Sequence, residues 1–259
     1  MTRTTLSPFV IAAVAVVAST ASASAEGEVN LYSSRHYDTD ERLITRMQAE
    51  GANSPADVLI TVDTSRLKRA KDAGVLQVVE SDVLEQRIPS NLQDSDNTWF
   101  GFSQRARIVF YNKADVTEPP MDYVSLADPK YKGMVCIRSS SNTYNQTLLA
   151  SIIENHGEEA ARAWAQGVVD NFAREPQGGD TDQLRGIVSG ECDIAVSNTY
   201  YFARALRTQV DGVSEEIDSI GWVFPAQEAE GAHMNLSGAG VAAHAPNREN
   251  AVAFLEYLA

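Results

Sequence analysis

The sequence lacks the short motifs that mark several classes of enzyme and metal site. It contains no CxxC and no HExxH, and its cysteines and histidines do not cluster, so no thiolate-based zinc or iron–sulfur site is predicted. There is no G-x-S-x-G nucleophile motif and no histidine in a recognisable triad pattern. The stretch QGGDTDQ contains glycine but lacks the lysine and the spacing of a phosphate loop. These absences argue against an enzyme.

Positive charge is scarce. Lysine and arginine number 21 against 35 aspartate and glutamate residues, which gives a net charge of −14. Because the phosphates of nucleic acids repel an acidic protein, the composition argues against a nucleic-acid partner. A hydrophobic run long enough to span a bilayer is also missing, since the most apolar stretch covers only residues 9–18.

The N-terminus has the pattern of an export signal. Arg3 precedes the apolar stretch, and the small residues Ala23, Ser24 and Ala25 follow it. We therefore predict a signal peptide over residues 1–25, cleaved after Ala25, and a periplasmic protein; the alternative is a membrane anchor. Removing 25 of 259 residues leaves 234, and the loss of Arg3 changes the net charge from −14 to −15. A chain of this length forms one large domain or two smaller lobes.

The chain has two cysteines, Cys136 and Cys192, and its predicted export bears on whether they are bonded to each other. An even number of cysteines in an oxidising compartment favours a disulfide. We predict a bond between these two residues. Two buried free thiols are the alternative.

Short apolar runs alternate with amphipathic ones along the chain. Runs typical of strands cover residues 28–34, 56–62, 106–112, 134–140, 192–198, 221–225 and 239–244, and patterns typical of helices cover residues 40–50, 64–76, 146–172 with a break near Gly157, 181–191, 199–207 and 249–259. This alternation predicts an α/β protein with mostly parallel sheets.

Two turn-rich segments divide the chain. EPPMD contains Pro119 and Pro120, and VDGVSEE contains Gly212. They predict a first lobe made of residues 26–112 and 220–259, and a second lobe made of residues 113–219. Because ligands of open α/β folds bind at the carboxyl ends of strands, we expect a hinge and a binding cleft between the lobes.

Four tyrosines follow the carboxyl ends of predicted strands: Tyr37, Tyr144, Tyr200 and Tyr201. Tyrosine is an amphipathic residue that often serves only for packing. Four at equivalent positions, two of them adjacent, instead suggest a shared binding site. Phenolates are strongly anionic oxygen ligands, whereas calcium and magnesium sites use carboxylate-type oxygens and do not need phenols. A site with several phenolates therefore points to Fe(III).

The adjacent pair stands where a helix is expected to begin. Asn198 or Thr199 is expected to cap that helix. At a helix start, neighbouring side chains differ by about 100° rather than by the 180° of a strand, so both phenols can face one cleft. We also expect the positive end of the helix to favour the phenolate forms of Tyr200 and Tyr201.

Six segments resemble the periplasmic ferric iron-binding proteins of ABC importers. They are EVNLYSSRHYDTDE, SPADVLITVD, SQRARIVFYNK, YKGMVCIRSSSNTYNQ, FAREPQGGDTDQLRGIVSGECDIAVSNTYYFARAL and GAHMNLSGAGVAAHAPNRENAVAFLEYL. The motifs occur in order through nearly all of the chain after the signal. The resemblance implies a two-lobe periplasmic-binding-protein fold of the type II kind, closing on Fe(III). It also implies a monomer that delivers the ion to an inner-membrane ABC permease and catalyses no reaction.

The site residues follow from the matching motifs. The resemblance implies metal ligands at Tyr37, Tyr144, Tyr200 and Tyr201, with His36 as a further candidate, and a small anion or water held by Arg35 and Arg105. Arg105 and Arg107 alternate along one strand face, where they could bind an anion or pair with acidic groups.

The chain departs from the family pattern in two places. Asp40 runs directly into Glu41, where the family has the rest of a helix and a strand, and the chain stops at Ala259, where the family continues. We therefore expect a fold shortened in the first lobe and at the C-terminus. Two other functions remain open: a binding protein for a small organic or anionic solute, and a secreted hydrolase.

Overall fold

The computed structural model describes residues 27–33 and 39–259. The predicted signal peptide lies outside these residues. The strands are β1 (Leu31–Ser33), β2 (Val58–Thr61), β3 (Phe100–Asn112), β4 (Val135–Cys136), β5 (Ile194–Asn198), β6 (Ile220–Val223) and β7 (Met234–Val241). The helices are α1 (Thr39–Glu50), α2 (Thr64–Asp72), α3 (Asp82–Arg87), α4 (Thr143–His156), α5 (Glu158–Asp170), α6 (Asp180–Val188), α7 (Thr199–Arg207) and α8 (Arg248–Leu258).

The strands form one sheet in the order β1-β2-β7-β3-β5-β4, with β6 paired to β3. Only the pairs β1–β2 and β4–β5 are parallel among the described residues. The pairs that involve β3 or β7 are antiparallel. The prediction of mostly parallel sheets is therefore wrong. Hydrophobic periodicity reports which face of a strand is buried, but it does not report the direction in which the strand runs.

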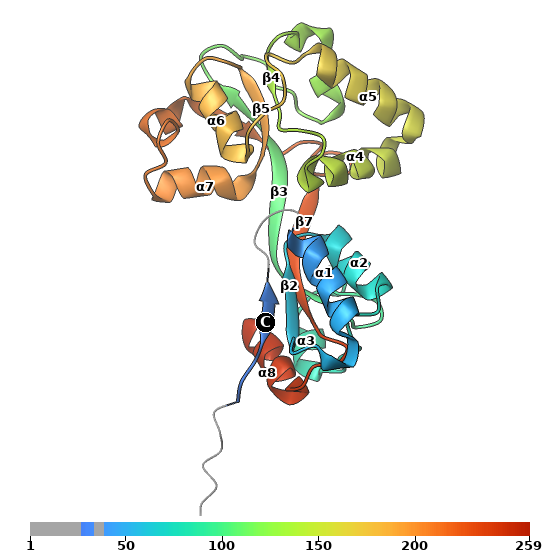
Figure 1. The fold of residues 1–259 in the computed structure, drawn as a ribbon. Coiled ribbons are helices and arrows are strands. Elements are labelled where there is room, and N and C mark those ends of the chain that lie inside the picture. Colours follow the sequence, from blue (N-terminus) through green and yellow to red (C-terminus); the bar gives the residue numbers. More distant parts are fainter. Residues whose placement is uncertain (1–26, 34–38) are drawn as a thin grey trace, which may run out of the picture.

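The long strand β3 joins the two halves of the molecule (Figure 1). Its residues from Phe100 to Ala106 pair with β7, and those from Arg107 to Asn112 pair with β5 and β6. We call the region of β1, β2, β7, the first part of β3 and helices α1, α2, α3 and α8 the lower half. The upper half contains the second part of β3, β4, β5, β6 and helices α4 to α7.

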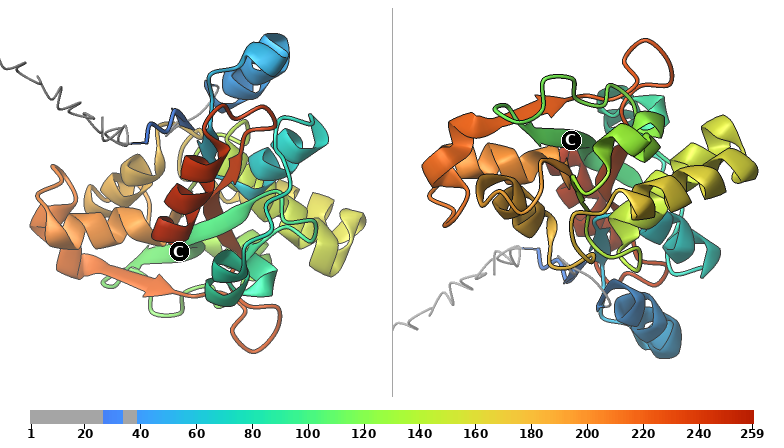
Figure 2. Two further views of the ribbon diagram at one scale, coloured as in Figure 1. Left: turned by 90° about the horizontal axis from the view of Figure 1, so that it is seen from below. Right: turned by 90° about the horizontal axis from the view of Figure 1, so that it is seen from above.

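In the lower half, apolar strands are covered by helices on both faces. Leu59 of β2 packs in a cluster with residues of α1 and α2, whereas its neighbour Val58 packs in a cluster with residues of α3 and α8. Seen from below, α8 lies across this end of the molecule, against β7 and α3 (Figure 2). The chain leaves α2 through Gly74, whose φ of +67° suits glycine.

In the upper half, α4 and α5 cover one side of the sheet, and α6 and α7 cover the other (Figures 1 and 2). Val109 of β3 faces the cluster that includes Leu148 and Trp164, and Phe110 faces the cluster that includes Leu184 and Phe202. The predicted break between α4 and α5 is confirmed at Gly157, where φ is +84°. The run of apolar residues in β3 thus reflects burial on both of its faces.

The predicted lobe limits, residues 26–112 with 220–259 and residues 113–219, are not decided by strand pairing and stay a prediction. In the part of the chain that the structure describes, no helix has the length and apolar character needed to cross a membrane.

Candidate metal-binding site

Tyr144 projects from the first turn of α4 in the upper half. Asn142 caps this helix, because its Oδ1 accepts a hydrogen bond of 3.0 Å from the backbone N–H of Tyr144. The Tyr144 side chain is buried. The cap therefore fixes the start of the helix and, with it, the direction in which the phenol leaves the backbone.

Tyr200 and Tyr201 lie in the first turn of α7, immediately after the buried strand β5. Their ring centroids are 4.2 Å apart, with an angle of 32° between the ring planes. The hydroxyl of Tyr200 lies 3.3 Å from that of Tyr144, within hydrogen-bonding distance. The start of a helix thus brings two adjacent phenols side by side, and a third phenol, from α4, meets that of Tyr200.

The predicted cap of α7 is only partly correct. Asn198 occupies the cap position, but its side chain makes no capping hydrogen bond, and Thr199 is already the first helical residue. The Oδ1 of Asn198 instead accepts a hydrogen bond of 3.2 Å from Arg107. Its Nδ2 has no hydrogen-bond partner among the described residues, although Asn198 is buried. Asn198 therefore does not make the capping hydrogen bond expected at a helix start, and its side chain binds Arg107 instead.

The electrostatics of Tyr200 differ from the expectation that the helix end favours phenolates. Burial raises the pKa of Tyr200 above its ordinary value, and the neighbouring Tyr144 raises it further. In the protein alone, this phenol is therefore neutral at physiological pH. A ligand that binds the phenolate must displace its proton, as a highly charged cation does.

Three guanidinium groups surround the Tyr144 ring. Their central carbons lie 5.3 Å from the ring centroid for Arg105, 5.6 Å for Arg138 and 5.9 Å for Arg107. At these distances each cation is attracted to the face of an aromatic ring.

Arg105, a predicted anion-binding residue, is buried and held by the lower half. Its Nη1 donates to Ser237 at 3.2 Å, its Nη2 donates to the carbonyl oxygen of Val62, and Asp63 lies 3.8 Å from it. The Nε of Arg105 has no partner within the described residues. Arg105 stands beside the phenols, and its role toward an anion stays a prediction.

Arg107 is engaged differently, and of the two roles predicted for it, binding an anion or pairing with acidic groups, the structure shows the pairing. It is only 2% exposed, and its two Nη atoms bind three side chains from three different elements. One of these is Asp180, which is fully buried at the start of α6 and also pairs with Arg138 at 3.2 Å. The alternation of Arg105 and Arg107 along one strand face could be recognised from the sequence. Nothing local to Asp180 distinguishes it from an ordinary residue at a helix start.

The remaining predicted site residues, Arg35, His36 and Tyr37, lie outside the described residues. The predicted disulfide is confirmed. Cys136 of β4 and Cys192, which precedes β5, are bonded, and their Cα atoms are 5.8 Å apart. The bond joins the chain upstream of Tyr144 to the chain upstream of Tyr200.

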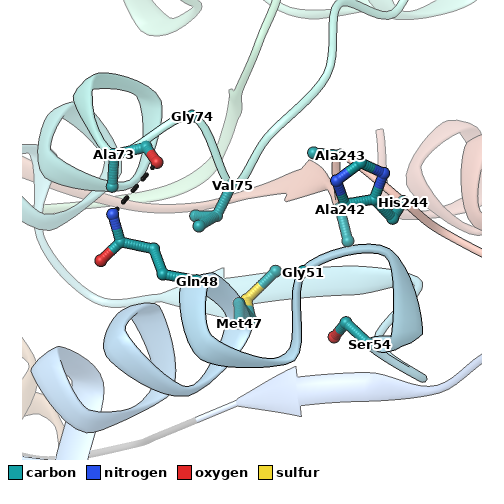
Figure 3. Close-up of a pocket in the computed structure, with 10 residues that line it drawn as sticks. All are labelled: Met47, Gln48, Gly51, Ser54, Ala73, Gly74, Val75, Ala242, Ala243 and His244. Carbon is teal, nitrogen blue, oxygen red and sulfur yellow. Dashed lines mark hydrogen bonds between the residues drawn. The ribbon is translucent and has the colours of Figure 1, made fainter.

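A separate hollow of about 260 Å³ lies in the lower half, between α1, the end of α2 and the end of β7 (Figure 3). Its lining includes Met47, Gln48 and His244, and Gln48 donates a hydrogen bond of 3.3 Å to the carbonyl oxygen of Ala73. Among the residues that the structure describes, no tyrosine or arginine lines it. Across residues 27–33 and 39–259, no three histidine, cysteine or acidic side chains are grouped to hold a metal. The phenol cluster in the upper half is therefore the better candidate for a metal site.

Comparison with known proteins places the chain in a family. The family model described as bacterial extracellular solute-binding protein matches residues 53–259. Iron uptake protein A1 of Synechocystis sp. is 48% identical over 254 residues, which cover 89% of this chain and 71% of the relative. The chain belongs to the ferric iron-binding periplasmic proteins. Members of this family bind a solute and are not enzymes, as the sequence predicted.

Two solved structures show the same mixed α/β periplasmic-binding-protein fold. One is the Trichodesmium protein IdiA (FutA) in complex with iron and citrate ligands, with a TM-score of 0.83 and 47% identity. It matches over 89% of this chain and 80% of its own. The other is a ferric binding protein from Campylobacter jejuni, with a TM-score of 0.82 and 39% identity over 89% of this chain and 81% of its own. The predicted fold class is confirmed.

Proposed function

We propose that this protein captures Fe(III) through the phenolates of Tyr144, Tyr200 and Tyr201 and delivers the ion to an inner-membrane ABC permease. The observation that carries the proposal is the convergence of these three phenols. Two hydroxyl groups lie 3.3 Å apart, and the adjacent rings of the pair lie 4.2 Å apart. Membership in the ferric iron-binding periplasmic proteins supports the same function.

Charge balance explains why phenols suit this ion. Fe(III) is a hard cation, and three phenolates neutralise its charge. Because burial keeps Tyr200 neutral in the protein alone, binding must release its proton. The exchange discriminates against cations of lower charge, which displace phenol protons less effectively.

The rest of the coordination shell is proposed from the sequence. Tyr37 stands in the chain between β1 and α1, two elements of the lower half, and we propose it as the ligand supplied by that half. His36 is a further candidate. Arg35 and Arg105 are proposed to hold a small anion or water at the remaining position. The presence of citrate with iron in the Trichodesmium relative supports an anion there.

Transport by this route requires a protein that works outside the inner membrane. The predicted signal peptide and the family support a periplasmic location. A single chain that binds one ion between two halves has no need of a second copy, and we propose a monomer. The permease is the proposed partner.

The test is the visible spectrum of the mature protein. Metal-free protein is mixed with Fe(III) supplied as a weak chelate, and phenolate-to-iron charge transfer is expected to give an orange to red band that a strong chelator removes. Tyr257→Phe is the matched control, because Tyr257 is 86% exposed on α8 and should leave the band unchanged. A colourless protein whose thermal unfolding is unaffected by saturating Fe(III) would refute the proposal.

The arginines around Tyr144 favour one alternative, a site for a small organic anion alone. Calorimetric titration with citrate separates the two functions. Our proposal expects citrate to bind measurably only when Fe(III) is present. Equal citrate binding with and without iron would favour the alternative.

A further inference from the structure

Arg107 occupies the position where β3 changes its pairing partner from β7 to β5. Its backbone N–H donates to the carbonyl oxygen of His233, and its own carbonyl oxygen accepts from the hydroxyl of Tyr123 at 2.5 Å. Its guanidinium is almost fully buried. A buried cation is costly unless it is paired and hydrogen-bonded, so the partners of this group determine whether it is tolerated.

The partners of Arg107 connect the two helices that carry the phenols. Its Nη2 donates at 2.6 Å to Oδ1 of Asn145, the residue after Tyr144 in α4. Its Nη1 donates at 3.2 Å to Oδ1 of Asn198, two residues before Tyr200. One rigid, planar group thus binds the start of α4 and the start of α7 together.

Asp180, at the start of α6, completes this connection. One of its oxygens, Oδ2, accepts from Arg107 at 2.9 Å and from the backbone N–H of Asn198 at 2.9 Å. Its other oxygen accepts from Arg138 at 3.2 Å. The carboxylate therefore neutralises charge in the cluster and holds the backbone that leads into α7.

We infer that Arg107 and Asp180 are positioning residues that set the spacing between Tyr144 and the Tyr200–Tyr201 pair for binding Fe(III). This inference rests on the proposed function. Successive helix residues differ in direction by about 100°, so a small rotation of either helix start would carry its phenol away from the shared position. Residues that orient metal ligands commonly matter nearly as much as the ligands themselves.

The contacts of Asn198 distinguish a positioning role of this cluster from a purely stabilising one. A side chain at a cap position ordinarily accepts a bond from the helix N–H groups, but Asn198 directs its oxygen to Arg107 and leaves its buried Nδ2 without a partner in the described chain. Both choices cost stability locally. Side chains that depart from the locally most stable arrangement are expected at functional sites.

The first test is Arg107→Lys. Lysine keeps the positive charge but lacks the planar guanidinium group whose two Nη atoms bind three partners. Fe(III) should still bind, with a shifted charge-transfer band and roughly 10- to 100-fold weaker binding. Arg174→Lys is the matched control. Arg174 is another largely buried arginine of the upper half, and it pairs with Glu191 and donates hydrogen bonds to Asp182 and Gln183 of α6 rather than to a helix that carries a phenol. The control should keep the band and the affinity of the wild type.

The second test is Asn198→Ser, which decides the question if Arg107→Lys fails to fold. Serine is a favourable cap residue, so the free energy of unfolding should be unchanged or higher, while the contact with Arg107 is lost. We expect a shifted band and faster iron release without loss of stability. A stable variant with the wild-type band and release rate would overturn the inference. If instead the wild type shows no Fe(III) band, the proposed function itself fails.

Discussion

Two buried carboxylates, one in each half of the molecule, make different kinds of contact. In the lower half, the buried Asp57 accepts hydrogen bonds from the backbone and side-chain N–H groups of Asn30 and Asn247, which are all neutral donors. In the upper half, the buried Asp180 lies between two guanidinium groups. Neutral bonds suffice to hold a strand beside a helix. The ion cluster of Asp180, Arg107 and Arg138 instead consists of charged groups, and its hydrogen bonds fix the directions of these side chains near the phenols.

Under the proposed function, this difference implies that the upper half is arranged to bind Fe(III) before the lower half contributes a ligand. It holds three phenols, the disulfide and the buried ion cluster. The lower half offers Arg105 and, by the proposal above, Tyr37. Capture by the upper half followed by contact with the lower half is the order of events that the comparison suggests.

The largest effect is expected from removing a phenol of the upper half. Tyr200→Phe should abolish the coloured complex, because the apolar ring leaves the charge of the cation unbalanced. Tyr37→Phe should keep a weaker complex that releases iron faster. Iron titrations and release rates on both variants measure the contrast. The comparison breaks if Tyr37→Phe proves the more damaging of the two.

The two buried carboxylates should differ when each is neutralised. Asp180→Asn leaves two buried guanidinium groups without their counter-charge and should lower the free energy of unfolding by roughly 3–5 kcal/mol. Asp57→Asn loses bonds to neutral donors and should cost about 1–2 kcal/mol. Urea unfolding of both variants, each with and without Fe(III), gives the values. Equal losses would show that the ion cluster is no more demanding than the neutral one.

Removal of the disulfide tests whether the upper half owes its geometry to the covalent bond. The bond closes a loop between residues 56 positions apart, and Cys136→Ala with Cys192→Ala should lower the free energy of unfolding by roughly 4 kcal/mol. The charge-transfer band of the folded double variant should be unchanged, because Arg107 and Asp180 still hold the helix starts. A shifted band would assign part of the positioning to the disulfide.

The last effect concerns His233, which lies where the halves meet. Burial, and secondarily the charge of Arg107, lowers the pKa of His233 to about 4 from an ordinary value near 6.5. The unfolded chain therefore takes up this proton first, so stability falls as the pH drops from about 6.5 to about 4, by about 2–3 kcal/mol.

His233→Gln should flatten that part of the stability profile, whereas the exposed His244→Gln should leave it unchanged. Thermal unfolding between pH 7 and pH 4 measures both. Identical profiles for the wild type and His233→Gln would contradict the assignment.

Some of these features could be predicted from sequence because they follow from local chemistry, from composition or from a general rule about strand ends. The helix start at Thr199, the break at Gly157 and the disulfide each follow from a few adjacent residues or from composition. The convergence of Tyr144 with Tyr200 followed from a rule about strand ends.

Other features depend on contacts between distant segments. The direction of β3 and β7 is set by which strands they meet across the sheet, and no periodicity encodes it. Asp180 looks like any acidic residue in the first turn of a helix until Arg107 and Arg138, 73 and 42 residues away, are brought to it. The same long-range bond draws the Asn198 side chain away from the cap that local chemistry predicts.

The position of β7 also bears on how the chain folds. The strand lies between β2 and β3, although more than 120 residues of sequence separate Ala106 from Met234, the residues paired at one end of their ladder. Most of the upper half is continuous in sequence and can collapse through nearby contacts. The sheet of the lower half stays incomplete between β2 and β3 until β7, which comes late in the sequence, pairs with both strands. Closing so long a loop is entropically costly and slow. This topology predicts that assembly proceeds from the middle of the sequence outward, so that the half that carries the phenols takes shape before the half that contains β7.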